Sequence, residues 1–133
     1  MEYVKLNNGV EMPILGYGVY QVTPEECERC VSDAIKIGYR SIDTAQAYHN
    51  EEGVGRAVRK SGIPREEFFI TTKVWITNGG YEKAKASIDE SLRKLQTSYV
   101  VGNHILDRIN AGIFLSKVVM QSFNRWKKRY RTG

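Results

Sequence analysis

Along residues 1–100, short apolar runs alternate with longer stretches in which apolar residues recur at helical spacing. The short runs predict buried strands, and these are expected at 13–18, 40–43 and 68–74. The longer stretches predict amphipathic helices, and these are expected at 24–38, 50–61 and 81–95. Strands that alternate with helices of ten or more residues are typical of an α/β fold with a parallel sheet.

A hairpin is expected before the first of these strands. Tyr3–Leu6 and Val10–Met12 can form its two strands, because Asn7, Asn8 and Gly9 between them supply a glycine-containing turn. The sheet therefore begins after a small antiparallel element.

The expected helices carry local start and stop signals. Thr23 before Pro24, with Glu26 three residues further on, is typical of a capping box at a helix start. Gly38 is expected to end that helix. Asn50 is expected to cap the second helix with its side chain.

Length and charge divide the chain into two parts. Its 133 residues suffice for one ordinary domain, but a complete eight-unit barrel typically has about 250. Residues 1–100 hold 13 Lys and Arg against 14 Asp and Glu, whereas residues 101–133 hold 7 against 1. The net charge of +5 therefore belongs to the second part, and we expect two regions, 1–100 and 101–133.

The two cysteines and the N-terminus bear on the cellular setting. Cys27 and Cys30 lie within an expected helix, without a second Cys or His pair at ligand spacing, so burial is favoured over a redox or metal site. So few cysteines indicate a reducing, cytoplasmic location. We find no signal peptide at the start and no run of about 18 apolar residues, so no membrane span is expected.

Residues 101–133 are expected to form a divergent basic tail. Val101–Ile105 is too interrupted by glycine and polar residues for a confident buried strand, and 110–130 can form one more helix. The basic and aromatic side chains near 125–131 are of the kind that bind nucleic acid or an anionic membrane. Without a recognised module, a solvated tail is favoured, and neither nucleic acid nor a membrane is expected as a partner.

An acid, a phenol and an amine follow the apolar runs closely. Asp43 and Lys73 stand near the ends of neighbouring strands, and Tyr48 lies on the loop after the first of them. A parallel barrel brings such positions to one rim. An ammonium group beside a phenol favours the phenolate, and a carboxylate can hold the ammonium in place. The trio suits protonation of a carbonyl oxygen, although an Asp–Lys pair in a barrel is also often only structural.

Several motifs of residues 1–100 resemble the N-terminal part of the aldo-keto reductase family, especially bacterial enzymes similar to diketogluconate and methylglyoxal reductases. The motifs are Asn8–Pro13, Gly16–Tyr20, Gly38–Ala45, Glu51–Gly55 and Thr71–Trp75. The resemblance implies a partial (β/α)8 TIM barrel, with about the first three to four βα units after an N-terminal β-hairpin. It also implies NADP(H)-dependent reduction of small aldehydes and ketones.

The resemblance further implies roles for individual residues. Tyr48 would be the proton donor, Lys73 would make the phenol of Tyr48 more acidic, and Asp43 would hold Lys73 in place. The residues expected beside the cofactor are Gly18, Val19, Tyr20 and Asp43. The residues expected to wall the substrate pocket are Tyr20, His49 and Trp75, although His49 could equally be an exposed polar residue and Trp75 a cap on the core.

The second part of the chain departs from the family pattern. The family expects a histidine at the position of Leu106, and His104 stands two residues early, so its role is not transferred. The alternative interpretation is a truncated, inactive half-barrel that self-associates through open edges. In that case inner-facing residues such as Ile42, Ile70 and Thr72 would lack opposing layers.

Overall fold

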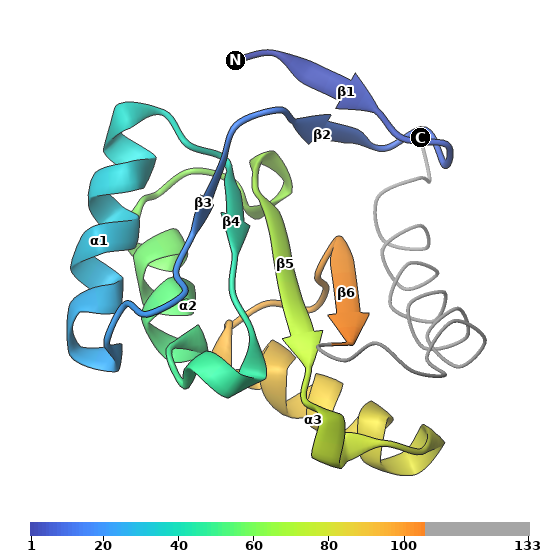
Figure 1. Ribbon diagram of the computed structural model, residues 1–133. Helices are drawn as coiled ribbons and strands as arrows, with labels where there is room; N and C mark the ends of the chain where they lie inside the picture. The colour runs from blue at the N-terminus through green and yellow to red at the C-terminus, as the bar shows by residue number, and fades with distance from the viewer. Residues whose placement is uncertain (106–133) are drawn as a thin grey trace.

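The computed structural model of the protein describes residues 1–105 and consists of a hairpin, a sheet and three helices (Figure 1). The hairpin pairs β1 (Tyr3–Lys5) and β2 (Glu11–Pro13) in antiparallel fashion. The sheet is parallel, in the order β3 (Gly16–Gly18), β4 (Ser41–Asp43), β5 (Phe69–Val74) and β6 (Gly102–Ile105). The helices are α1 (Pro24–Ile37), α2 (Glu51–Lys60) and α3 (Tyr81–Lys94), with 3₁₀ turns η1 (Gln46–Tyr48), η2 (Arg65–Glu67) and η3 (Ile76–Asn78).

The spatial order of the four strands equals their order in the sequence. Each helix therefore links one strand to its parallel neighbour, as a crossover connection requires. The hairpin lies across the end of the sheet at which the strands begin (Figure 1). The opposite end, where the strands finish, is left to the loops that carry the candidate chemistry.

The local signals at α1 act as predicted. The Glu26 amide donates to Thr23 Oγ1 at 3.4 Å, which satisfies one of the unpaired amides at the helix start. Gly38 ends the helix with a φ of 117° and donates to the carbonyls of Ala34 and Ile35.

The first predicted strand is shorter than expected. The run 13–18 is divided, because Pro13 ends β2 and only Gly16–Gly18 pairs with β4. Ile14 and Leu15, at the corner between the two sheets, are 55% and 62% exposed. The Ile14 amide still donates to the Glu2 carbonyl, so this corner continues the hairpin rather than the parallel sheet.

Residues Gly102–Ile105 form a strand that the sequence did not predict. They pair in parallel with β5, and the Val101 amide donates to the Ile70 carbonyl just before them. The Arg65 guanidinium holds the approach to this strand, because it donates to the Tyr99 carbonyl and stacks on that ring at 4.3 Å. Main-chain pairing at an available strand edge does not require apolar side chains, which explains why the pattern missed it. The helix predicted at 110–130 lies outside the described residues.

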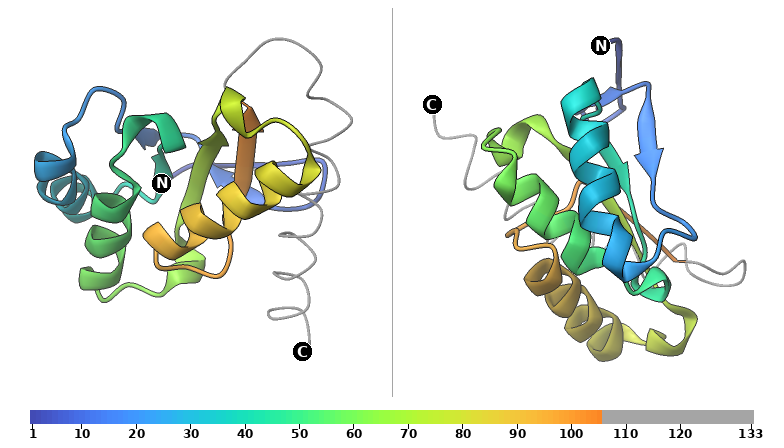
Figure 2. Two further views of the ribbon diagram at one scale, coloured as in Figure 1. Left: turned by 90° about the horizontal axis from the view of Figure 1, so that it is seen from below. Right: turned by 90° about the vertical axis from the view of Figure 1, so that its left-hand side faces the viewer.

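The inner residues named in the sequence analysis lie on the other face of the sheet from the one expected. Ile42, Ile70 and Thr72 are fully buried, and the two isoleucines belong to the core formed with the helices. The expectation that they lack an opposing layer is therefore wrong, since they face α1, α2 and α3, which cover one side of the sheet (Figure 2). Strand alternation places Asp43 and Lys73 on the other face.

Two glycines allow α2 to pack closely against both neighbouring helices. A Cβ on Gly53 would lie 2.8 Å from the Cβ of Cys27 in α1. A Cβ on Gly55 would lie 2.6 Å from the carbonyl oxygen of Lys94, where α3 ends. Such short distances leave no room for even one methyl group. The position of α2 is thus set from two sides.

No helix within residues 1–105 is long and apolar enough to cross a bilayer.

Substitution of Gly55 by alanine tests this packing. We expect Gly55→Ala to lower the free energy of unfolding by about 1–3 kcal/mol, because the methyl group meets main-chain atoms that cannot turn aside. Urea unfolding followed by circular dichroism measures the change. Gly79→Ala is the matched control, since its Cβ would lie an ordinary 3.6 Å from the nearest atom. Equal stabilities of the two variants would contradict the close packing.

Candidate active site

Three of the predicted site residues meet where β4 and β5 end. Lys73 Nζ lies 2.5 Å from Asp43 Oδ2 and 3.5 Å from the Tyr48 hydroxyl oxygen. Its third donor position is directed to the Thr44 carbonyl at 3.2 Å. An ammonium group has three hydrogens, so all three are engaged in this arrangement. The amine therefore stands between the carboxylate and the phenol.

Strand register explains why the pair forms. Asp43 lies opposite Thr71 in the parallel ladder, and Lys73 is two residues further along β5 on the same face. Thr71 also donates its hydroxyl to Asp43 Oδ1 at 2.5 Å, so both carboxylate oxygens accept a hydrogen bond. The Asp43 side chain is held from the neighbouring strand at two points.

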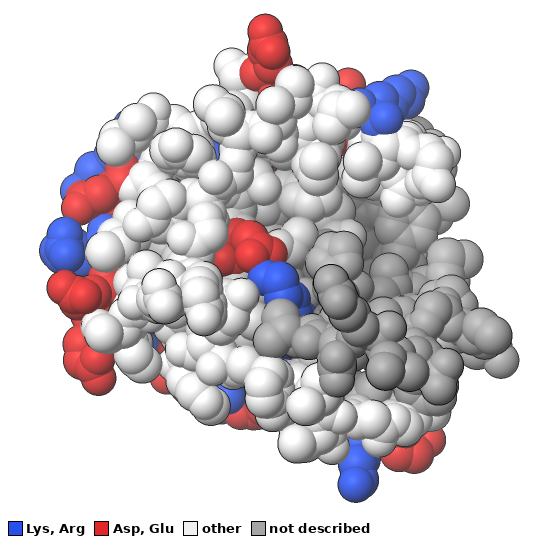
Figure 3. Space-filling model, in the orientation of Figure 1, with Lys and Arg blue, Asp and Glu red and all other residues white. Residues whose placement is uncertain are grey.

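Partial burial strengthens the ion pair. The Lys73 side chain is 16% exposed, and that of Asp43 is 44% exposed. A charge removed from water in this way interacts more strongly with its partner than a surface pair does. The Tyr48 ring lies with its centroid 5.1 Å from the Lys73 ammonium, which adds a cation–π contact. In the orientation of Figure 1, acidic and basic atoms lie side by side near the middle of the surface, and charged side chains gather over α1 at its edge (Figure 3).

The residues predicted beside a cofactor are brought together only in part. Gly18 is in register with Asp43, and among residues 1–105 nothing beyond its chain neighbours lies within 4 Å of the position a Cβ would take. Tyr20 is 66% exposed, with its ring centroid 5.2 Å from that of Tyr48. The Val19 side chain is fully buried in the core and does not reach the rim.

The other predicted substrate residues lie next to the trio. His49 follows Tyr48, is exposed, and has a φ of 55°. Trp75 follows the end of β5 and is 36% exposed. His49 and Trp75 line a cavity of about 330 Å³ together with Gln46, Ala47, Asn78 and Lys94. Neither Tyr48 nor Lys73 lines that cavity, so His49 and Trp75 are not gathered with the trio around one cavity.

Asn50 has a function that the sequence did not reveal. It precedes α2, but its side chain does not cap the helix, which corrects the expectation. Its amide nitrogen donates to the carbonyls of Val19 and Val22, and its amide oxygen accepts from the Thr44 hydroxyl at 2.8 Å. The side chain is fully buried, and these bonds join the loops that follow β3 and β4. An Asn before a helix gives the same local signal for either role.

A second buried polar contact lies behind β5. Glu51 is only 2% exposed, and its carboxylate accepts from the Thr72 hydroxyl at 2.6 Å. Thr72 stands between Thr71 and Lys73 but points to the helix side. The strand segment that carries Lys73 is thus fixed from both of its faces.

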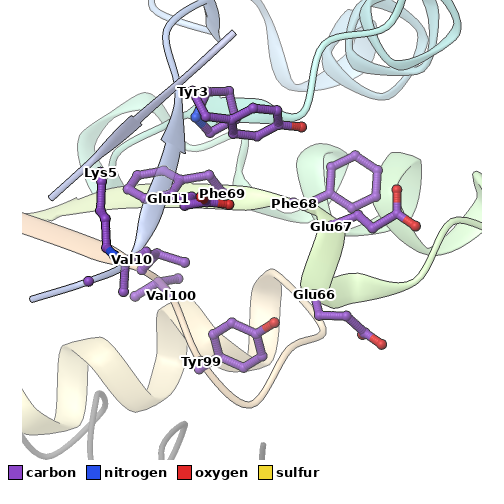
Figure 4. Close-up of a pocket in the computed structure, with 13 residues that line it drawn as sticks. Tyr3, Lys5, Val10, Glu11, Glu66, Glu67, Phe68, Phe69, Tyr99 and Val100 are labelled. Atoms are coloured by element: carbon purple, nitrogen blue, oxygen red, sulfur yellow. The ribbon is translucent and has the colours of Figure 1, made fainter. Parts of the chain in front are cut away.

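A larger cavity lies at the other end of the sheet, under the hairpin (Figure 4). It has a volume of about 490 Å³, and the rings of Tyr3, Phe68, Phe69 and Tyr99 are among its walls. It is separate from the ends of β4 and β5 and contains none of the trio. Within residues 1–105, no group of three or more His, Cys, Asp or Glu side chains is placed to hold a metal ion.

Comparisons with known proteins agree on one family. The family model described as Aldo/keto reductase family matches residues 14–108. Over 98 residues the chain is 54% identical to a glyoxal reductase of Bacillus subtilis. The aligned segment covers 73% of this chain and 36% of the relative. Over 97 residues it is 47% identical to the methylglyoxal reductase DkgA of Escherichia coli, with 73% and 34% covered. The chain therefore spans about a third of the length of these curated relatives.

Solved structures agree with the fold. The crystal structure of an aldo/keto reductase from Brucella melitensis superposes with a TM-score of 0.82 at 43% identity, covering 96% of this chain and 48% of that one. A Bombyx mori aldo-keto reductase in complex with NADP superposes with a TM-score of 0.76 at 28% identity, covering 96% and 47%. The predicted fold class, an α/β partial (β/α)8 barrel, is confirmed.

The reactivity of Cys27 tests whether the packing between α1 and the start of α2 keeps its thiol buried. Its thiol is fully buried and donates to the Asn50 carbonyl at 3.4 Å, and burial raises the pKa of Cys27 to about 11. A raised pKa leaves the thiol protonated below that value, so the thiolate fraction at pH 8 is about one in a thousand. We expect Cys27 in a Cys30→Ser variant to react with a disulfide reagent at least about 100-fold more slowly when folded than in urea. Raising the pH towards 11 should accelerate the reaction, and fast labelling at pH 8 in the folded protein would contradict the burial.

Proposed function

The chain belongs to the aldo/keto reductase family, and on this basis we propose that residues 1–105 carry the proton-donating side of an NADP(H)-dependent carbonyl reductase. The observation that carries the proposal is the Lys73 ammonium held between the Asp43 carboxylate and the Tyr48 phenol. Two similar proteins are named for reduction of glyoxal and methylglyoxal. Small aldehydes and ketones, dicarbonyls among them, are the substrate class we assign.

In this proposal Tyr48 acts as the general acid. When bound, NADPH supplies the hydride that adds to the carbonyl carbon. The Tyr48 hydroxyl donates its proton to the carbonyl oxygen, which becomes the alcohol. The phenolate that remains is stabilised by the Lys73 ammonium 3.5 Å away, and Asp43 keeps that ammonium oriented.

The residues present fit the nicotinamide end of such a cofactor. Gly18 has no side chain beside Asp43, and residues 1–105 leave the position of its missing Cβ open, so a flat ring can approach the main chain there. Gly18, Tyr20 and Asp43 are the residues that would hold it. Val19 would contribute through its main chain, since its side chain is buried and its amide donates to the Asp43 carbonyl. Lys73 is already paired with Asp43, so the phosphates of the cofactor need other cations.

Three side chains would wall the substrate. Tyr20 supports this role through its ring contact with Tyr48 and its 66% exposure. His49 follows Tyr48 directly in the chain and Trp75 stands two residues beyond Lys73, although the cavity that both line includes neither Tyr48 nor Lys73. Aromatic side chains around a small carbonyl exclude water and leave the phenol as the donor.

A second candidate function is favoured by the extent of the sheet. Four parallel strands are half of those in an eight-strand barrel, and β3 is an edge strand of the sheet formed by residues 1–105. In this alternative residues 1–105 form an inactive half-barrel that associates through this strand edge. The family membership is the same in both cases, and turnover by the 133-residue chain itself would rule out the alternative.

The first prediction concerns the chain alone. We expect the purified 133-residue protein to show no NADPH oxidation with methylglyoxal above the background rate, because the four parallel strands within residues 1–105 do not close a barrel around the reactants. The absorbance of NADPH measures this directly. Clear turnover that disappears in Tyr48→Phe would overturn the half-barrel alternative.

The second prediction concerns the trio within a closed barrel. A chimera in which residues 1–100 replace the corresponding segment of the Bacillus subtilis glyoxal reductase should reduce methylglyoxal. Within it, Tyr48→Phe should lower kcat by about 100- to 10,000-fold, because the proton donor is lost. Tyr39→Phe, before β4 begins, is the matched control and should leave kcat unchanged. An active chimera whose rate is unaffected by Tyr48→Phe would refute Tyr48 as the donor.

A further inference from the structure

The Gln46 side chain joins three separate segments around the candidate site. Its amide nitrogen donates to the Ser87 carbonyl at 3.1 Å and to the Ser91 hydroxyl at 3.0 Å, both in α3. Its amide oxygen accepts from the Trp75 amide at 2.9 Å and from the Asn78 side-chain amide at 3.1 Å, both beyond β5. Four partners from residues 29 to 45 positions away thus converge on one side chain.

These bonds fix the orientation of the amide. A main-chain amide such as that of Trp75 can only donate, and a main-chain carbonyl such as that of Ser87 can only accept. The Gln46 oxygen must therefore face Trp75 and its nitrogen must face Ser87. With two donors and two acceptor positions in use, the group is fully satisfied, and a rotated or shortened side chain would leave partners without a hydrogen bond.

Gln46 stands at the point where Tyr48 and Lys73 have to be brought into register. It begins η1, which ends at Tyr48, while Trp75 is two residues beyond Lys73. Hydrogen bonds within η1, from Tyr48 to Ala45 and from His49 to Gln46, set the shape of the turn. These bonds do not set the distance between η1 and the end of β5. The bond from the Trp75 amide to the Gln46 side chain sets that distance.

The contact that this distance governs is sensitive to displacement. Lys73 Nζ and the Tyr48 hydroxyl oxygen are 3.5 Å apart, at the outer limit for a hydrogen bond. A shift of η1 by about 1 Å away from β5 would break it. By contrast, the Asp43–Lys73 pair spans β4 and β5 and does not involve η1.

We propose that Gln46 is a positioning residue, which holds the turn bearing Tyr48 against the strand end bearing Lys73 and so sets the phenol–ammonium contact. The inference rests on the proposed function, since the contact matters only if Tyr48 donates the proton. Gln46 itself touches neither the phenol nor the amine. It also fixes the main chain of Trp75, and thus the point from which that proposed substrate wall extends.

The experiment uses the full 133-residue chain labelled with 3-fluorotyrosine. The fluorine resonance of Tyr48 is assigned by its loss in Tyr48→Phe. Lys73→Met defines the displacement of that resonance when the ammonium is removed. We expect Gln46→Met, which keeps the length of the side chain but none of its four hydrogen bonds, to displace the resonance by at least half as much. The Trp75 amide, followed by hydrogen exchange, should exchange at least tenfold faster.

A matched control uses a partner residue whose side chain Gln46 does not contact. Ser87→Ala retains the main-chain carbonyl that accepts from Gln46 and removes only a hydroxyl bonded to the Ala84 carbonyl. It should leave both the resonance and the Trp75 exchange rate unchanged. A purely structural role of Gln46 would lower the unfolding midpoint without moving the Tyr48 resonance at a temperature where all variants are folded, and this result would overturn the proposal.

The outcomes also separate this inference from the proposed function. No displacement in Lys73→Met would mean that the ammonium does not contact the phenol, which contradicts the proposed function and this inference together. Displacement in Lys73→Met but not in Gln46→Met would overturn this inference alone. If Gln46→Met does not fold, Gln46→Asn keeps the amide on a side chain that is one methylene shorter, so η1 has to shift for the bond to the Trp75 amide to form. It should displace the resonance in the same direction, and an unmoved resonance would refute the positioning role.

Discussion

The ion pair between Lys73 and Asp43 is the interaction on which the rest of the site depends. It spans two neighbouring strands, so it exists only if β4 and β5 keep their register. A partly buried ammonium without a partner would lower the free energy of unfolding, so loss of either charge would destabilise the protein strongly. The carboxylate is held by Thr71, and the ammonium reaches the phenol of Tyr48. One pair of charges thus connects the geometry of the sheet with the chemistry at its end.

Hydrogen-bonded polar groups behind the rim complete this arrangement. Asn50 ties the loops after β3 and β4, and Glu51 holds Thr72 on the helix side of β5. Gln46 continues this order to η1 and α3. The apolar core would tolerate small shifts of these loops, but satisfied polar groups select one arrangement, because each displaced partner loses a hydrogen bond. The core provides stability, and the polar layer specifies where the functional groups stand.

Features with a local cause were predictable from the sequence. The capping signal of Thr23, the terminating Gly38 and the turn of the hairpin each act within a few residues, and the corresponding elements are confirmed. The meeting of Asp43 and Lys73 was also predictable, because parallel strands end together.

Features caused by distant partners were not predictable in the same way. The sequence did not reveal β6, because the free edge of β5 supplies its pairing. It assigned Asn50 to a helix cap, since the distant carbonyls that its amide reaches leave no local pattern. The prediction that Ile42 faces the inside of the barrel was wrong. Strand alternation defines two faces of a sheet but does not say which face the helices cover.

The two glycines of α2 have a consequence for how this protein tolerates change. Asn50 stands directly before that helix, so a displacement of its axis is passed to the loops at the reactive end of the sheet. Gly53 and Gly55 keep the axis at the closest approach that two neighbours permit. A survey of random variants would therefore find positions remote from the rim whose replacement displaces Asp43, Lys73 and Tyr48 while the chain still folds, and the inner side of this helix is where such lesions should concentrate.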